Sequence, residues 1–447
     1  MSIDRLYWLW ISLRCGAACT EFPRLVESFA SVDDIYNADY EQYIDVGVSE
    51  RLASDLSDKS LDLAKSILSY CQSARVGIMC YEDEEYPVSL KTLKDPPIVL
   101  YYLGRLPELN RKLCIATVGT RRMSEYGRRA AYKIAYEIAS AGAVVVSGMA
   151  LGIDGIAASA AIAAKGKTVA VLGCGIDRVY PTYHGKLCDI IKQNGAVITE
   201  YPPATEPRGT NFPVRNRIIS GLCQGTVVID ADIDSGAMIT AKKAILQGRD
   251  IYAVPGNIDD ENSSGTNSLI RDGAQAVLCG ADVIKNYASL YRSVIDIQRM
   301  RNSERYSEYN ESIIRRFKVG TRIYPKKDLT DAEEKGNGTG RVGSLDGGKT
   351  GEEIKSIQAA TKTNETADEK SSAPDNRGEG GDRSAKALES LTEKQRKIFD
   401  EMPLEGSVTL DYFTNAGFKM GEVMSALTVL EIKGLIIALP GALYARK

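Results

Sequence analysis

LCIATVGTRR, residues 113–122, runs from a continuous apolar segment directly into a glycine, a threonine and two arginines. An uninterrupted apolar run of this kind is typical of a strand that is covered on both faces. The small residues expose backbone N–H groups where the strand ends, and the arginines add fixed positive charge, a combination that suits phosphate oxygens. The stretch therefore predicts a buried parallel strand that ends at an anion site.

Three more runs of small, hydroxyl-bearing or basic residues occur downstream: SGMA at 147–150, FPVRNR at 212–217 and SGAMITA at 235–241. For each run an ordinary turn with solvated polar side chains is the alternative interpretation. Arg215, Asn216 and Arg217 would open a helix over 214–222, where basic residues oppose the helix dipole and a bound anion would offset that cost. Together the four runs predict one binding groove, provided that they meet in the fold.

The alternation of short apolar runs with helical spacing over 112–288 predicts that they do meet. Buried strands followed by helices give a parallel sheet with right-handed crossovers, and ligands bind at the carboxyl ends of such strands. All four runs fall at that edge. An edge strand is expected at 98–103. The expected strands of the parallel sheet are 113–118, 143–147, 168–172, 196–199, 226–229 and 250–254, and the expected helices are 124–140, 152–165, 184–193, 214–222 and 238–247.

The flanking regions have a different composition. Residues 1–80 are expected to form a small all-helical domain, of SAM or helix-hairpin-helix type, as an accessory bundle or as a weak DNA contact. The parallel-sheet domain would cover 81–290, and 291–388 is expected to be a largely disordered linker, because 331–388 holds no aromatic residue and few large aliphatic ones. Residues 389–447 are expected to form a winged helix.

The winged-helix prediction rests on the order of elements near the C-terminus. Thr392 and Gln395 fit a capping box, helices are expected over 410–416 and 420–433, and strands at 435–439 and 442–444 flank a Pro-Gly hairpin signal. Seven basic and seven acidic residues in 391–447 leave this domain without the positive face of a duplex reader. A protein contact or a weak DNA contact is expected of it.

Composition excludes several function classes. The 447 residues have a formal net charge of -3, so positive charge must be local. His184 is the one histidine, which argues against histidine-based triads and metal sites, and the nine cysteines contain no CxxC pair and are expected to be reduced, in the cytoplasm. No apolar window is long enough for a membrane span. We expect no metal and no cofactor.

The carboxylates near the predicted groove give no sign of catalysis. A hydrolase would need a placed pair or a carboxylate with a metal, and no spacing enforces either. Asp154 is expected to cap a helix, and Asp232 and Asp234 to cap or turn. Binding without an enzymatic reaction is therefore the favoured interpretation.

The order of motifs resembles the DNA-processing protein A family, also called DprA/Smf. The resemblance is carried by 118–122, 147–154, 173–181 (GCGIDRVYP), 200–203 (EYPP), 212–217, 235–241, 254–256 (VPG) and 264–274. It covers some 290 residues. It implies a homodimer with an extended Rossmann-like domain that binds single-stranded DNA, protects it and helps to load RecA during natural transformation, without enzymatic activity.

Site residues follow from the resemblance motif by motif. Gly119, Thr120 and Arg121 would hold phosphate, and Arg178 and Lys186 would extend the basic track. The rest of the groove would be lined by Ser147, Gly148, Arg215, Asn216, Arg217, Ser235, Gly236 and Thr240. The sequence departs from the family at Leu151, where a basic residue is common, at Ala158, which replaces the usual histidine, and at Asp230, where a glutamate often ends the strand.

A nucleotide-binding enzyme on a similar fold is the competing hypothesis. A nucleoside monophosphate phosphoribohydrolase would need a PGGxGTxxE stretch that supplies a carboxylate near the ribose. The corresponding region here reads SGAMIT at 235–240 and holds no glutamate.

Overall fold

The computed structural model describes residues 3–320 and 322–323, and in the C-terminal region 391–403, 408–409, 412–413, 416, 418, 423, 426–427, 430, 435–439 and 443–446. The chain divides into two compact units, Met1–Asn364 and Glu365–Lys447, which are described separately. Within the described ranges, no helix combines the length and the apolar character needed to cross a membrane.

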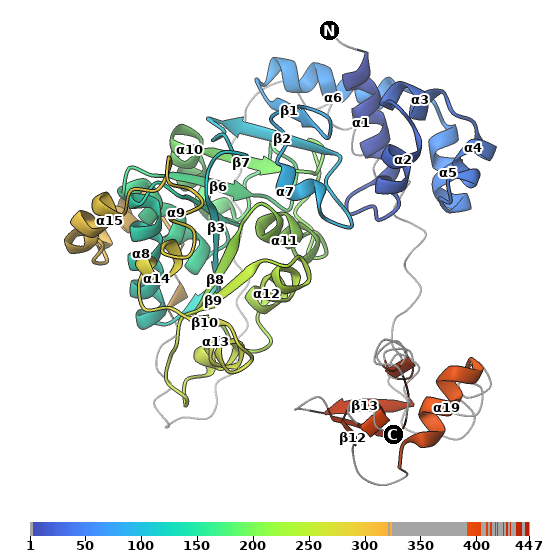
Figure 1. Ribbon diagram of the computed structural model, residues 1–447. Helices are drawn as coiled ribbons and strands as arrows, with labels where there is room; N and C mark the ends of the chain where they lie inside the picture. The colour runs from blue at the N-terminus through green and yellow to red at the C-terminus, as the bar shows by residue number, and fades with distance from the viewer. Residues whose placement is uncertain are drawn as a thin grey trace, which may run out of the picture. The chain divides into compact units, whose positions relative to one another are not determined.

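A nine-stranded sheet forms the centre of the first unit (Figure 1). Its strands run in the order β1-β2-β7-β6-β5-β3-β8-β9-β10. All the strands from β7 onward in this spatial order are parallel to one another. All six predicted strands of the parallel sheet are present. The strands are β1 (Gly77–Cys80), β2 (Val99–Gly104), β3 (Cys114–Gly119), β5 (Val144–Ser147), β6 (Lys167–Val171), β7 (Ala196–Thr199), β8 (Gly225–Ile229), β9 (Asp250–Ala253) and β10 (Gln275–Ala276).

The prediction of an edge strand at 98–103 is wrong in one respect. β2 does form there, antiparallel to β7, but β1 pairs with its other side and takes the edge. β1 is too short to show an alternating pattern, and it lies in the region that was expected to be helical. The sequence therefore missed the strand that ends the sheet.

Alternate residues of the central strands enter two cores, one on each face. Ile115 and Val145 face the core covered by α8 (Glu125–Ser140), α9 (Ile153–Ala163) and α10 (Gly185–Asn194), whereas Ala116 and Val146 face the core of α11 (Asn211–Gly221) and α12 (Gly236–Leu246). Figure 1 shows α8 and α9 on one side of the sheet and α11 and α12 on the other. Coverage on both faces explains why these strands read as continuous apolar runs.

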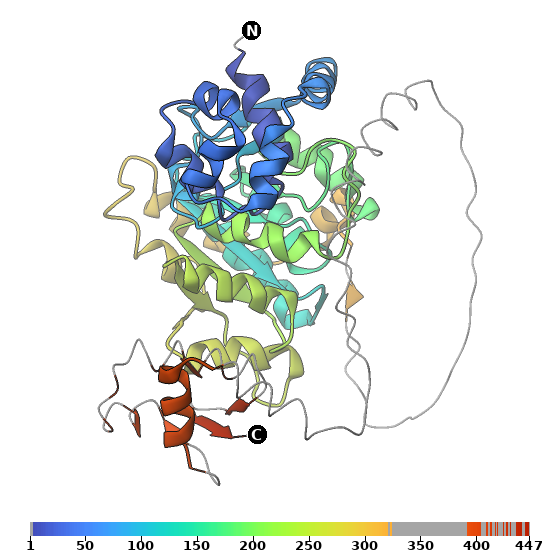
Figure 2. The ribbon, with the colours of Figure 1, turned by 90° about the vertical axis from the view of Figure 1, so that its right-hand side faces the viewer.

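Six helices precede the sheet and share its first core (blue in Figure 2). Local capping sets several of their starts: the Ser31 side chain accepts from Asp34 N at 3.1 Å, and Asp39 and Gln42 form a capping box. Arg5 ties the group to the sheet edge by donating to Ile78 O at 2.7 Å. The helices are α1 (Asp4–Cys15), α2 (Phe22–Ser28), α3 (Val32–Asn37), α4 (Tyr40–Asp45), α5 (Glu50–Ser57) and α6 (Asp62–Ser73).

The expected linker begins later than residue 291. Residues 297–323 form α15 (Ile297–Ser303), a 3-10 turn at Glu304–Tyr306, α16 (Glu311–Phe317) and β11 (Arg322–Ile323). Met300, Ile314 and Phe317 are buried in the first core. These few apolar residues are too widely spaced to stand out in a charged sequence, but they pack against a helical surface that already exists. The remainder of the expected linker, 324–388, lies outside the described residues.

The second unit contains α19 (Glu393–Glu401) with the predicted capping box of Thr392 and Gln395. β13 (Ile436–Leu439) and β14 (Leu443–Arg446) form the predicted hairpin, and β12 (Val408–Thr409) joins β14. Most of the second and third predicted helices falls outside the described residues. The winged helix therefore stays a prediction.

Candidate nucleic-acid interface

A cleft of about 1470 Å³ opens at the carboxyl ends of the central strands. β3 is followed in the chain by β5, β6 and β7 on one side, and β8 then returns to its other side. This reversal is the position at which open α/β sheets bind ligands. Eight predicted site residues line the cleft: Gly119, Thr120, Arg121, Arg215, Asn216, Ser235, Gly236 and Thr240. Gly148 lines a small side pocket next to it.

The end of β3 is fastened to the end of β8. Thr120 N donates to Asp230 O at 2.8 Å, and a Cβ on Gly119 would lie 1.9 Å from Ile229 O. Only glycine allows this close approach. Arg121, which follows, is exposed at the mouth of the cleft.

The loop after β5 is shaped by Asp154, and the expectation that this residue caps a helix is wrong. Its carboxylate accepts from Gly148 N at 2.8 Å and from Ala150 N at 3.4 Å, while α9 begins without a side-chain cap. Burial raises the pKa of Asp154, and the nearby Arg215 opposes that shift. Asp154 thus holds the loop in place and partly balances a buried cation.

Arg215 is that cation, and it does not open a helix. α11 begins at Asn211, three residues before the predicted start, so Arg215 lies in its second turn and the helix-dipole argument for it is wrong. The side chain is buried and donates to Gly148 O at 2.9 Å and to Val171 O. Burial lowers the pKa of Arg215 to about 10, which leaves it charged at neutral pH. It supplies fixed positive charge to the floor of the cleft.

An aromatic ring lies between the two arginines of the cleft. The guanidinium carbons of Arg121 and Arg215 are 5.6 and 5.8 Å from the centroid of the Phe212 ring, and Tyr180 stacks on the same ring at 5.1 Å. Cations near a ring face are favourable at these distances. Sequence reasoning included Phe212 and Tyr180 in motifs but not among the site residues. The available signal was that both lie close in sequence to basic residues, Tyr180 in the loop after β6 and Phe212 in the first turn of α11.

The start of α12 completes the cleft. Ser235 is the N-cap residue, yet its Oγ is buried and has no hydrogen-bond partner among the described residues. A Cβ on Gly236 would meet nothing within 4 Å, so the backbone there is open to the cleft. Free N–H groups and a partnerless hydroxyl at a helix N-terminus suit an anion.

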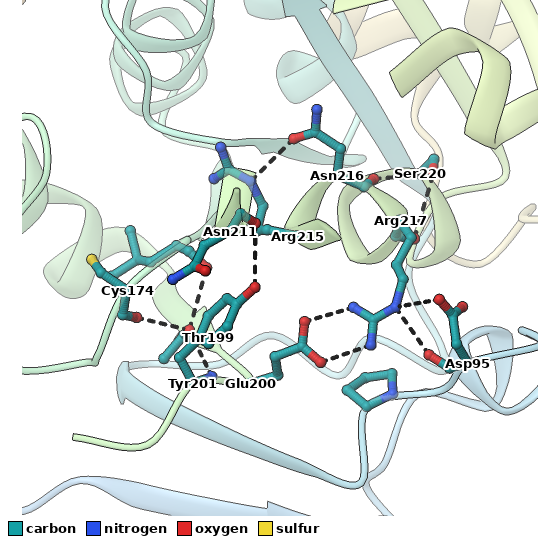
Figure 3. Close-up of polar contacts among 12 residues, drawn as sticks. Asp95, Cys174, Thr199, Glu200, Tyr201, Asn211, Arg215, Asn216, Arg217 and Ser220 are labelled. Atoms are coloured by element: carbon teal, nitrogen blue, oxygen red, sulfur yellow. Dashed lines mark hydrogen bonds and ion pairs between the residues drawn. The ribbon is translucent and has the colours of Figure 1, made fainter. Parts of the chain in front are cut away.

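Arg217 is not brought into the cleft. Its side chain is 2% exposed and forms two hydrogen bonds with Glu200, at 2.6 and 2.7 Å, while Nε lies 3.1 Å from Asp95 Oδ2 (Figure 3). Burial alone would lower the pKa of Arg217, but Glu200 and Asp95 raise it. Arg217 therefore joins α11 to the end of β7 and to the loop before β2.

Three other predicted residues also lie outside the cleft lining. Ser147 is buried below the loop that it precedes, and Arg178 pairs with Glu206 at 3.0 Å and with Asp177 at 3.6 Å. Lys186 is exposed in the first turn of α10. All three residues lie in or near the matched motifs, but none of them lines the cleft.

The cleft lining contains further charged residues that were not among the predicted site residues. Arg122 and Arg129 add positive charge. Besides Glu125 and Asp154, five carboxylates also line the cleft: Asp232, Asp234, Asp259, Asp260 and Glu261. Two of them have structural partners, since Asp260 accepts from Asn262 N at 3.0 Å at the start of α13 (Glu261–Arg271) and Asp232 accepts from Ser264 Oγ at 3.1 Å. The cleft lining thus carries both signs of charge, and the guanidinium groups of Arg121 and Arg215 are the groups that can attract an anion.

The ionised carboxylate of Asp230, next to the cleft, destabilises the folded state. It is 5% exposed, with a left-handed φ of 53°, and only its Oδ2 has a donor, Ser124 N at 2.5 Å. Burial raises the pKa of Asp230 from 3.8 to about 6, and Asp260 adds to the shift. Between about pH 4 and 6 the folded chain therefore binds this proton more tightly than the unfolded chain does, and the cost is full above that window.

We expect Asp230→Asn to stabilise the fold at pH 8 by about 1 to 3 kcal/mol and to have little effect near pH 4. Asparagine keeps an acceptor for Ser124 N and tolerates the left-handed backbone. Urea unfolding of the variant and the original chain at both pH values gives the difference directly. If the variant is no more stable than the original chain at pH 8, the buried charge of Asp230 does not destabilise the fold.

A doubly covered, mainly parallel sheet with a cleft at its topological switch point defines a Rossmann-like α/β protein. The family model described as DNA recombination-mediator protein A matches residues 77–288. DNA processing protein DprA of Bacillus subtilis (strain 168) is 37% identical over 219 residues, which are 49% of this chain and 74% of the relative. DprA of Streptococcus pneumoniae (strain ATCC BAA-255 / R6) is 40% identical over 205 residues, 46% of this chain and 72% of the relative.

The fold agrees with these sequence relations. The X-ray structure of DNA processing protein A from Streptococcus pneumoniae superimposes with a TM-score of 0.56 at 33% identity, over 64% of this chain and 98% of that one. The chain belongs to the DprA/Smf family, as its motifs predicted.

Proposed function

We propose that this protein binds single-stranded DNA in the cleft and does no chemistry on it. One observation carries the proposal: Arg121, the buried Arg215 and the open start of α12 converge on one cleft. Each element favours phosphate for a different physical reason, which makes a shared anionic ligand the simplest account. The names of the family and of its relatives, which refer to DNA processing and recombination, support DNA as that ligand.

The aromatic pair favours single strands over duplex. Phe212 and Tyr180 stack on each other at the side of the cleft, and their rings can receive only bases that have left a helical stack. Stacking on aromatic rings is tolerant of sequence, so we expect little sequence preference.

The family's usual basic residue and histidine are both replaced in the β5–α9 region. Leu151 lines the side pocket and Ala158 is fully buried in α9. The lost charge at Leu151 makes the cleft more dependent on Arg121 and Arg215.

Absence of catalysis is part of the proposal. His184 is buried and hydrogen-bonded to the backbone, and the carboxylates nearest Arg215 and α8 hold loops. Nucleoside monophosphate phosphoribohydrolase activity, measured as base release, would overturn this part.

The cellular role is proposed from the family. It comprises protection of incoming DNA, loading of RecA during transformation, and homodimer formation. All nine cysteines are free, which agrees with a reducing, cytoplasmic compartment. The second unit would contact a protein or bind DNA weakly.

Arg121→Ala should weaken binding to all single-stranded sequences alike and reduce the slope of log K against log salt by about 0.7, the value for one lost phosphate contact. Filter binding of the full chain to oligothymidylate and to mixed-sequence DNA across a salt series measures both quantities.

Arg271→Ala is the matched control, since Arg271 is also exposed, lies on α13 and, among the described residues, makes polar side-chain contacts only with its neighbours Ser268 and Asp272. Unchanged affinity and slope for Arg121→Ala would show that the cleft does not hold phosphate.

A further inference from the structure

Residues 296–323, here called the strap, follow the region matched by the family model and run back along α8. Asp296 N donates to Ala141 O at 2.9 Å, next to the last turn of α8. Ser307 Oγ then donates to Glu137, and the ring of Tyr309 meets Tyr132 edge-on. At the first turn of α8, Arg128 Nη1 lies 3.5 Å from Glu311 Oε2. The strap thus leads from the last turn of α8 to its first turn, which adjoins the cleft.

The last residues of the strap are fastened to the cleft loops. Gly320 N donates to His184 Nε2 at 2.8 Å, and Gly320 O accepts from Gly152 N at 3.1 Å. His184 Nδ1 lies 3.0 Å from Met149 O, so the imidazole is neutral, with its proton on Nδ1. β11 then pairs in parallel with β4 (Arg122–Met123), with Arg322 opposite Arg122. The one histidine of the chain is used to dock this segment.

The docked end of the strap is strongly basic. Residues 311–323 contain four basic residues and one acidic residue. Arg315, Arg316 and Lys318 are exposed, and Arg315 pairs with Glu311 within α16. Arg316 and Lys318 have no ion-pair partner among the described residues. The dipole of α16 stabilises a cation at its C-terminal end, where Lys318 is the C-cap residue. A helix of seven residues explains one such charge and leaves the other unexplained.

We propose that Arg316 of α16 and the adjoining Lys318 form a second phosphate-binding surface, which continues from Arg121 and Arg122 and binds the DNA backbone after it leaves the cleft. The inference rests on the proposed function. The register of Arg322 against Arg122 provides the continuity, and the unpaired cations provide the charge complementarity.

Charge reversal tests the surface. Arg316→Glu with Lys318→Glu is compared with Arg299→Glu and Arg301→Glu, two exposed positions on α15 at the far end of the same strap. Binding of the full chain is measured with oligothymidylates of about 6 and about 30 nucleotides, lengths near the lower end of the usual range of site sizes and well above it.

The Arg316/Lys318 variant should lose at least about tenfold in affinity for the long probe at low salt, with a slope reduced by about 1.4, and should bind the short probe as before. The α15 variant should match the original chain for both probes. Circular dichroism checks that both variants are folded.

Two results would overturn the inference: an unchanged long-probe slope, or equal losses for both probes. If the original chain binds neither probe, the proposed function itself fails. If it binds both through Arg121 while the Arg316/Lys318 variant is unchanged, only the surface fails, and an acidic protein segment becomes the partner to test.

Discussion

Arg217→Ala should destabilise the first unit by about 3 to 5 kcal/mol. The substitution leaves Glu200, whose side chain is 4% exposed, as a buried charge without its bidentate partner, and frees Asp95 from the same guanidinium. A loss of this size is a large fraction of the stability of an ordinary domain. Urea unfolding at pH 7, followed by circular dichroism, measures it.

A double substitution distinguishes the contribution of the buried charges to stability from that of side-chain packing. Arg217→Met combined with Glu200→Leu removes both buried charges and keeps side-chain volume, so we expect it to recover most of the lost stability. A small effect of Arg217→Ala on unfolding, joined to a reduced salt slope for DNA, would instead return Arg217 to the list of phosphate ligands.

Phe212→Ala should reduce affinity for single-stranded DNA by about 5- to 150-fold, the range that corresponds to 1 to 3 kcal/mol for one stacked base. The ring is the surface that Arg121, Arg215 and Tyr180 share. Because no charge is removed, the salt slope should stay as it is. This combination distinguishes stacking from phosphate contact, since Arg121→Ala changes the slope.

Phe212→Tyr keeps the aromatic face and should retain affinity. Tyr40→Ala, at an exposed aromatic residue of α4, serves as the control. Fluorescence anisotropy with oligothymidylate at two salt concentrations suffices. An affinity of Phe212→Ala within twofold of the original chain would exclude base stacking at this ring.

Arg215 and Arg217 are two residues apart on α11, but their side chains have different surroundings. Successive residues of an α-helix are about 100° apart, so Arg215, Asn216 and Arg217 point in three directions. Arg215 turns to the floor of the cleft and Arg217 turns to Glu200 (Figure 3). Identical side chains in one motif therefore serve binding in one case and stability in the other.

The sequence by itself determined the parallel sheet, its two covering layers and the edge at which the cleft opens. Continuous apolar runs, small residues at strand ends and the order of motifs are local signals, and each survives in the linear chain. The family followed from the same signals.

Only the tertiary structure decided which charges reach the cleft. Four features depend on contacts between residues far apart in the chain: the burial of Arg217, the aromatic pair of Phe212 and Tyr180, the carboxylates in the cleft lining, and the strap docked on His184. A charged side chain looks the same in sequence whether it meets solvent, a carboxylate or a ligand. Its role is set by what the fold places opposite it.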